Sequence, residues 1–164
     1  MEDEYQEAIL LLMRDKRTDS LTGLGNYFAF QEYVRNLEAL GVGFSVVLFD
    51  MTNLKAANEE LGHFGADAVL HQVGQRIRCG YDHVFRHGGD EFAVVLPRCA
   101  LGGAQAVRDR IEKAVGVSRL KSGKPVAAVG ACIQVTPDVS LTAQLNRCDK
   151  NLELRKAELK RQLG

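Results

Sequence analysis

The sequence predicts an α+β domain in which helices pack around a mainly antiparallel central sheet, with one further helix at the N-terminus. Segments with apolar residues three and four apart alternate with short apolar runs of strand length. Two of these runs are separated by only four residues, which indicates a β-hairpin. The 164 residues contain no repeat and no low-complexity tract, and this length suits a single domain with a proper core.

Each element follows from local pattern. A continuous apolar run such as "FSVVLFDM" predicts a buried strand, and a glycine or a polar cap marks where a helix ends or begins. Asn26 is a suitable N-cap because its side chain can accept a backbone N–H. The predicted elements are helices at 4–16 and 27–40, a strand at 44–51, helices at 54–61 and 66–78, strands at 82–86 and 91–96, a helix at 103–115, a strand at 126–135 and a helix at 141–162.

The first helix is short and amphipathic, and two interpretations of it stay open. Its apolar stripe is wide for a single buried face. The helix either covers one flank of the core or pairs with another copy of the chain or an upstream segment. We therefore divide the chain into a linker or dimerisation helix at 1–17 and a main domain at 18–164. The apolar residues of this helix that could pair are Tyr5, Ile9, Leu12 and Met13.

The composition excludes several classes of protein. Lysine plus arginine and aspartate plus glutamate both number 21, so no global charge recruits nucleic acid or an anionic membrane. Any phosphate binding must therefore be local. The longest apolar stretch, 8–13, is too short to insert across a membrane. The four cysteines form no CxxC pair and follow no signal peptide, which predicts reduced thiols in a cytoplasmic protein.

The hairpin "RHGGDEF" carries the first chemical signal. Gly88 and Gly89 can supply the positive φ that a tight turn requires. A turn does not explain Asp90 and Glu91, which alternation along a strand would point to opposite faces. If the predicted strand at 44–51 neighbours the hairpin, Asp50 near its end converges with Asp90. Converging carboxylates repel one another unless a cation lies between them, and oxygen ligands suit Mg²⁺ bound together with a substrate phosphate.

The segment after Asp50 offers groups for that phosphate. The backbone N–H groups of Thr52, Asn53 and Leu54 open a helix, where they can face an anion. Lys55 adds a positive charge beside them.

Asn58 and Asp67 lie on either side of a glycine-containing turn at 62–65. An amide and a carboxylate suit guanine, whose N1–H and exocyclic amine are donors on the same edge. Either residue alone is typical of a solvated helix surface. Their joint spacing with the metal-binding signals favours a guanine site.

Four motifs in this order resemble the GGDEF domain of diguanylate cyclases: "DSLTGLGN", "DMTNLKAANEELGHFGAD", "RHGGDEF" and "CDKNLELRKAELK". The resemblance runs from about residue 19 to the C-terminus. It implies a palm-like, ferredoxin-like fold shared with class III nucleotide cyclases. It also implies the reaction, which condenses two GTP into cyclic di-GMP with release of two pyrophosphates and uses Mg²⁺ or Mn²⁺.

The resemblance assigns roles residue by residue. It implies that Asp50, the Met51 carbonyl and Asp90 bind Mg²⁺. Glu91 would be a further ligand or the base for the ribose 3′-hydroxyl. The remaining implied roles are Gly88 and Gly89 for close approach of the nucleotide, Asn58 and Asp67 for guanine, Leu21 and Leu24 for apolar walls, and Lys55, Lys156 and Lys160 for phosphates.

The chain departs from the family pattern at several positions. Tyr27 stands where an arginine is usual, Thr52 stands where a second acid is frequent, and Lys160 replaces an arginine. Lys156 and Lys160 lie on one helical face, so a phosphate clamp is retained, although lysine lacks the guanidinium fork. The alternative for this face is a solvated, charge-paired surface.

The inhibitory site of many relatives, an RxxD motif upstream of the signature, is predicted to be absent. Cys79 replaces the arginine, while Asp82 is retained. A thiol cannot hold phosphate or guanine as a guanidinium does. Product feedback through this site is therefore predicted to be lost.

Three functional hypotheses remain. The favoured one is an active diguanylate cyclase that works as a homodimer, because one domain holds one GTP and the product needs two. The second is a catalytically weak or inactive GTP-binding module that acts by protein interaction. The third is a cyclase with relaxed base choice. Asp67 disfavours the third, because adenine offers no N1–H donor at neutral pH.

Overall fold

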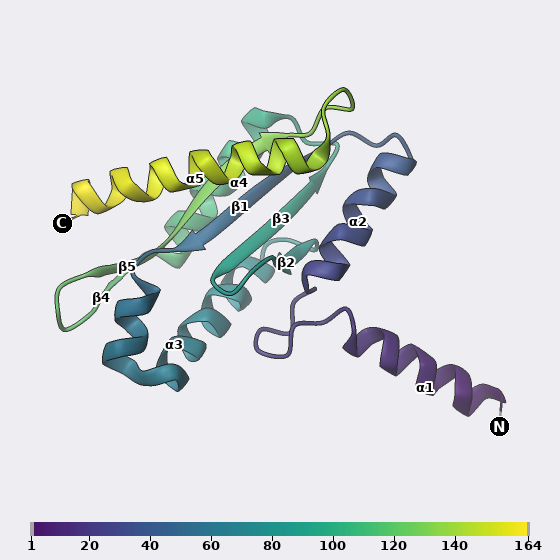
Figure 1. Ribbon diagram of the computed structural model, residues 1–164, viewed down its shortest axis with the longest axis horizontal. Coiled ribbons are helices and arrows are strands. Elements are labelled where there is room, and N and C mark those ends of the chain that lie inside the picture. Colours follow the sequence, from purple (N-terminus) through teal and green to yellow (C-terminus); the bar gives the residue numbers. More distant parts are fainter. Residues whose placement is uncertain (1, 164) are drawn as a thin grey trace.

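The computed structural model describes residues 2–163 and contains one five-stranded antiparallel sheet with the strand order β2-β3-β1-β5-β4 (Figure 1). Met1 and Gly164, the outer ends of the two predicted domains, lie outside the described residues. The α+β prediction is confirmed. The elements are α1 (Glu2–Asp15), α2 (Tyr27–Ala39), β1 (Phe44–Met51), α3 (Leu54–Arg78), β2 (Val84–Arg86), β3 (Glu91–Pro97), α4 (Leu101–Val115), β4 (Val117–Arg119), β5 (Pro125–Gln134) and α5 (Leu141–Leu163).

Helices cover both faces of the sheet. Val47 and Phe49 of β1 pack into one core with residues of α3 and α4, while Val46 and Leu48 pack into a second core with residues of α2 and α5. Because β1 is central and covered on both sides, all eight of its residues are buried. This burial explains why its sequence is a continuous apolar run and not an alternating one.

The register of β1 determines which groups meet at the end of the sheet. β1 pairs with β3 so that Asp50 lies opposite Glu91, and it pairs with β5 so that Met51 lies opposite Ala128. The strand that carries Asp50 near its end therefore neighbours the hairpin, as predicted. The N-cap prediction is also confirmed, because the Asn26 side chain accepts the Ala29 N–H at 3.1 Å.

Two parts of the chain differ from the prediction. The predicted break after residue 61 is confirmed, because Gly62 has a non-helical backbone with a φ of 73°, but the second helix follows directly at this kink and does not wait until residue 66, so α3 runs as one kinked element. The short edge strand β4 was not predicted. All three of its residues are exposed, so no apolar pattern marks it.

Helix α1 extends away from the rest of the molecule (Figure 1). Its apolar side chains are exposed, with fractions of 70% for Tyr5, 51% for Ile9, 61% for Leu12 and 47% for Met13. The interpretation that this helix covers a flank of the core is therefore wrong. Pairing with another segment stays a prediction. Within residues 2–163, no helix has the length and apolar character needed to cross a membrane.

Candidate active site

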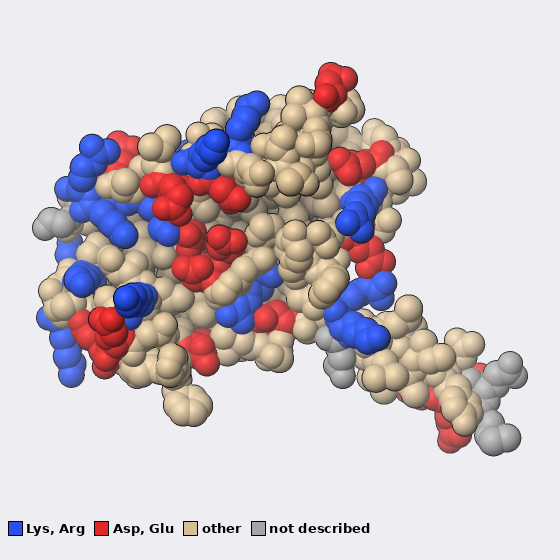
Figure 2. All heavy atoms as spheres, in the orientation of Figure 1, with Lys and Arg blue, Asp and Glu red and all other residues tan. Residues whose placement is uncertain are grey.

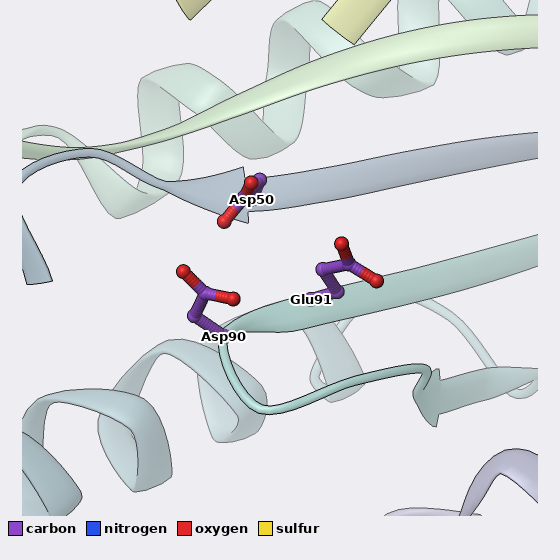
Figure 3. A group of neighbouring side chains, drawn as sticks. All are labelled: Asp50, Asp90 and Glu91. Atoms are coloured by element: carbon purple, nitrogen blue, oxygen red, sulfur yellow. The ribbon is translucent and has the colours of Figure 1, made fainter. Parts of the chain in front are cut away.

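Three carboxylates converge where β1 ends beside the hairpin. Asp50 is the penultimate residue of β1, Asp90 ends the hairpin loop and Glu91 begins β3. One oxygen from each lies within 4.8 Å of the others, and Figure 3 shows Asp50 and Asp90 facing one another with Glu91 beside them. The expectation that Asp90 and Glu91 point to opposite faces is wrong. Asp90 precedes the strand, so strand alternation does not apply to it.

Asp50 is the most buried of the three acids. Its Oδ2 accepts a hydrogen bond from Lys156 Nζ at 2.7 Å, and within residues 2–163 its buried Oδ1 has no hydrogen-bond partner. Burial and the neighbouring Asp90 raise its pKa to about 6, although Lys156 acts in the opposite direction. A buried, unpartnered carboxylate oxygen beside two further carboxylates is a donor set that fits a hard divalent cation.

Glu91 has a different environment. A hydrogen bond from His87 lowers the pKa of Glu91, although partial burial opposes that effect. The bond joins His87 Nδ1 to Glu91 Oε2 at 3.3 Å. Gly88 lies against the same oxygen, since a Cβ added there would be 2.8 Å from it. Neither Gly88 nor Gly89 has a positive φ, so the predicted reason for these glycines is wrong. At Gly88 the reason is space beside Glu91.

The hairpin loop is anchored by Arg86, which sequence reasoning did not assign to the site. Its guanidinium donates to the Gly89 carbonyl at 2.7 Å and to Asp19 Oδ1 at 3.1 Å. Asp19 in turn accepts hydrogen bonds from the backbone N–H and the hydroxyl of Thr22. These bonds connect the loop to the "DSLTGLGN" segment. The motif itself was the only signal that could have identified Arg86 and Asp19.

A pocket of about 310 Å³ reaches the acidic cluster at Asp90. Asn58 and Asp67, the predicted guanine-binding residues, line it together with Leu54, Gly89 and Asp90. The pocket therefore joins the predicted base-binding groups to the acidic cluster. His63, which was not predicted as a site residue, also lines it.

The predicted apolar walls do not line this pocket. Leu24 is buried in the core shared by α3 and α4, and Leu21 packs against the same core. Both leucines therefore anchor the "DSLTGLGN" segment to this core. A direct contact of either with a base stays a prediction.

The junction between β1 and α3 is built differently from the prediction. The Thr52 N–H, expected to face an anion, donates to the Ala127 carbonyl at 2.9 Å. The buried Thr52 hydroxyl and the Asn53 side chain both donate to the Pro125 carbonyl. These bonds hold the junction against β5, so Thr52 has a structural role. Lys55 follows with an exposed side chain.

Of the two predicted phosphate-binding lysines on α5, only Lys156 touches the acidic cluster. Its side chain is mostly buried. Burial alone would lower the pKa of Lys156, but the nearby Asp50 and Glu153 carboxylates raise it. Lys160, one turn later, is exposed. In Figure 2, which shows the molecule in the orientation of Figure 1, acidic side chains gather near the middle of the surface and basic side chains border them. The site is therefore a negative centre with positive charge at its margin.

Asp149, also on α5, was not predicted as a site residue. Burial and the charge of Glu91 raise its pKa, so it lies within the electrostatic reach of the cluster.

The position of the predicted absent inhibitory site lies on the α3–β2 connection. Cys79 and Asp82 are both exposed there. Loss of product binding at this position stays a prediction.

A family model described as "Diguanylate cyclase, GGDEF domain" matches residues 16–162. The chain belongs to the GGDEF family. The match begins close to the predicted domain boundary at residue 18.

The relatives of this GGDEF chain include one named as a diguanylate cyclase and one named as a cyclic di-GMP phosphodiesterase. It is 31% identical to diguanylate cyclase VdcA of Vibrio cholerae over 88% of this chain and 45% of VdcA. It is 32% identical to cyclic di-GMP phosphodiesterase NbdA of Pseudomonas aeruginosa over 94% of this chain and 20% of NbdA. The chain thus spans less than half of each of these relatives.

Solved GGDEF structures share the fold. The coiled coil and GGDEF domain of DgcB from Caulobacter crescentus, solved in complex with c-di-GMP, superposes with a TM-score of 0.78. The alignment covers 95% of this chain and 88% of DgcB at 22% identity.

Proposed function

We propose that this chain is a diguanylate cyclase that condenses two GTP into cyclic di-GMP and two pyrophosphates. The observation that carries the proposal is the convergence of Asp50, Asp90 and Glu91 beside the pocket lined by Asn58 and Asp67. An acidic cluster alone fits many divalent-cation sites. A cluster that shares a pocket with an amide and a carboxylate fits a guanine nucleotide whose phosphates reach the cation.

Asn58 and Asp67 select the base in this proposal. Guanine donates from N1–H and from its exocyclic amine, and a carboxylate accepts such donors well. Adenine has an acceptor at N1, which would face the Asp67 carboxylate with no proton between them. A site that hydrogen-bonds a substrate group discriminates strongly against an analogue lacking it.

Asp50, Asp90 and Glu91 would hold Mg²⁺ or Mn²⁺. When bound, the cation would neutralise charge on the triphosphate and on the departing pyrophosphate. The lowered pKa of Glu91 favours the ligand role over the base role, because a carboxylate that stays charged is a weak proton acceptor. The Lys156 ammonium group, which donates to Asp50 at the edge of the cluster, could turn toward a nucleotide phosphate bound there.

The reaction requires two copies of the chain. Each ribose 3′-oxygen forms a bond to the α-phosphorus of the other GTP, and the bond from that phosphorus to the pyrophosphate oxygen breaks. The hydroxyl proton leaves to water or a nearby base. One pocket holds one nucleotide, so two domains must face each other. The exposed apolar residues of α1 support a role for this helix in bringing two copies together.

A GTP-binding module with weak or no turnover is the second candidate. Two observations favour it: Lys160 is exposed away from the cluster, and NbdA, which matches 94% of this chain, carries the name of a phosphodiesterase.

The test is an incubation of purified protein with Mg²⁺ and equal GTP and ATP, with the products resolved by mass. The proposal predicts cyclic di-GMP as the main product. Bound but unconverted GTP would support the second candidate, and an adenine-containing cyclic product would show relaxed base choice.

A further inference from the structure

His87 has a defined environment that the proposed chemistry does not use. Its imidazole packs edge-on against two aromatic rings of α2, with centroid distances of 4.8 Å to Phe30 and 5.2 Å to Tyr27. The interplanar angles are 88° and 81°, which is the T-shaped arrangement that aromatic pairs prefer. Phe30 is itself 1% exposed, so the ring rests on a well-packed wall.

The backbone ties His87 to Glu91 as well. The His87 N–H donates to the Glu91 carbonyl at 2.8 Å, across the base of the hairpin. The backbone bond and the ring contacts therefore connect His87 to both β3 and α2. From this position His87 Nδ1 lies 3.3 Å from Glu91 Oε2. Because an ionised carboxylate can only accept, Nδ1 carries the proton in this bond, whichever charge state the ring has.

This bond restricts a side chain that would otherwise be mobile. The Glu91 side chain is 39% exposed and has several rotatable bonds. The hydrogen bond from His87 holds Oε2 on one side and so restricts the rotamers open to the Glu91 side chain. In the resulting rotamer Glu91 joins Asp50 and Asp90 in the cluster.

We propose that His87 is a positioning residue that holds the Glu91 carboxylate in place for a divalent cation. The inference rests on the proposed function, which gives the cation its role, but cation binding can be measured without turnover. Partners that orient metal ligands typically affect metal affinity by about 10- to 100-fold. For a partly exposed carboxylate with a bond of 3.3 Å we expect the lower end of that range.

The experiment is a double-mutant cycle read out as Mn²⁺ affinity, measured by electron paramagnetic resonance on the protein without nucleotide. His87→Phe keeps a ring against α2 but removes the donor. It should weaken Mn²⁺ binding about tenfold in the parent chain. In the Glu91→Gln background the same change should have an effect of less than about twofold, because His87 acts through Glu91. A matched control is His83→Phe. The His83 ring also stacks on an aromatic residue, Tyr33, at a centroid distance of 4.4 Å, and its replacement should leave Mn²⁺ affinity unchanged.

A second pair of variants covers the case in which His87→Phe does not fold. His87→Asn and His87→Leu are similar in size, but only the asparagine amide can donate near the position of Nδ1. The asparagine variant should bind Mn²⁺ several-fold more tightly than the leucine variant.

Turnover gives an independent readout. If the chain makes cyclic di-GMP, His87→Phe should lower kcat while the KM for GTP stays within about twofold, because the base-binding residues are untouched.

Three results would each overturn the inference. One is an equal loss of Mn²⁺ affinity in the parent and Glu91→Gln backgrounds, which would indicate a general structural effect. The second is unchanged affinity in folded His87→Phe, and the third is equal affinity in the asparagine and leucine variants. A parent chain that binds Mn²⁺ with the predicted dependence on His87 but makes no product would refute the proposed function and leave this inference standing.

Discussion

Replacing Asp50 by asparagine should make the metal-free protein more stable while abolishing turnover. The pKa of Asp50 is raised from 3.8 to about 6 by burial and by Asp90, so the folded chain holds this proton more tightly than the unfolded chain does. Charging the group therefore costs stability, and the cost grows as the pH rises from about 4 to about 6 and is complete at neutral pH. A shift of this size corresponds to about 3 kcal/mol.

We expect Asp50→Asn to raise the free energy of unfolding in EDTA by about 1 to 3 kcal/mol at pH 7.5, with the difference fading toward about pH 4. The lower value applies if the Lys156 amine, which donates to Asp50 at 2.7 Å, is held less well by an amide oxygen. The assay is urea unfolding followed by circular dichroism at several pH values, beside GTP consumption with Mg²⁺.

The control is Asp19→Asn, for which the opposite sign is expected. Burial opposes ionisation of Asp19, but hydrogen bonds from Thr22 and the charge of Arg86 together lower its pKa. Its replacement should therefore reduce stability at neutral pH. A destabilised Asp50→Asn variant, or one that still consumes GTP at a near-parental rate, would refute the reasoning about this acid.

Three further predictions concern substrate and assembly. Asp67→Ser should narrow the GTP:ATP ratio of kcat/KM about tenfold by removing an acceptor for guanine, and an unchanged ratio would exclude that role. Lys156→Met should lower kcat/KM for GTP by about 10- to 100-fold, whereas the exposed Lys160→Met should change it about threefold at most; equal effects would contradict the placement of the two lysines. Specific activity should rise with protein concentration, and removal of residues 1–17 should reduce it more at low concentration than at high. A constant specific activity in a chain that sedimentation shows to be monomeric with a GTP analogue would exclude the homodimer.

The parts of the fold that could be predicted are those with a strong apolar pattern. The run at 44–51 predicted a buried strand because both faces of β1 are covered, and the hairpin beside it brought Asp50 to Asp90 as expected. The strand β4 could not be predicted, since its three residues are exposed and carry no pattern. Helix α1 shows the opposite case, in which an apolar stripe faces solvent.

The details of the site depended on contacts between distant residues, which no local pattern shows. The Thr52 hydroxyl donates to the Pro125 carbonyl, which is far away in sequence. The role of Thr52 in holding the β1–α3 junction against β5 could therefore not be predicted from its sequence neighbours. The space required at Gly88 is set by the position of Glu91 Oε2, which is hydrogen-bonded to His87. Side-chain packing therefore decided the points at which sequence reasoning failed.

Diguanylate cyclase activity is tested most directly by the product that purified protein forms from equal GTP and ATP with Mg²⁺. The convergence of the acidic cluster with the pocket of Asn58 and Asp67 predicts that GTP is consumed and that cyclic di-GMP is the main product by mass. Addition of EDTA should stop the reaction. If folded protein at high concentration forms no cyclic dinucleotide, or forms a product built mainly from adenine, the chain is not a GTP-specific diguanylate cyclase.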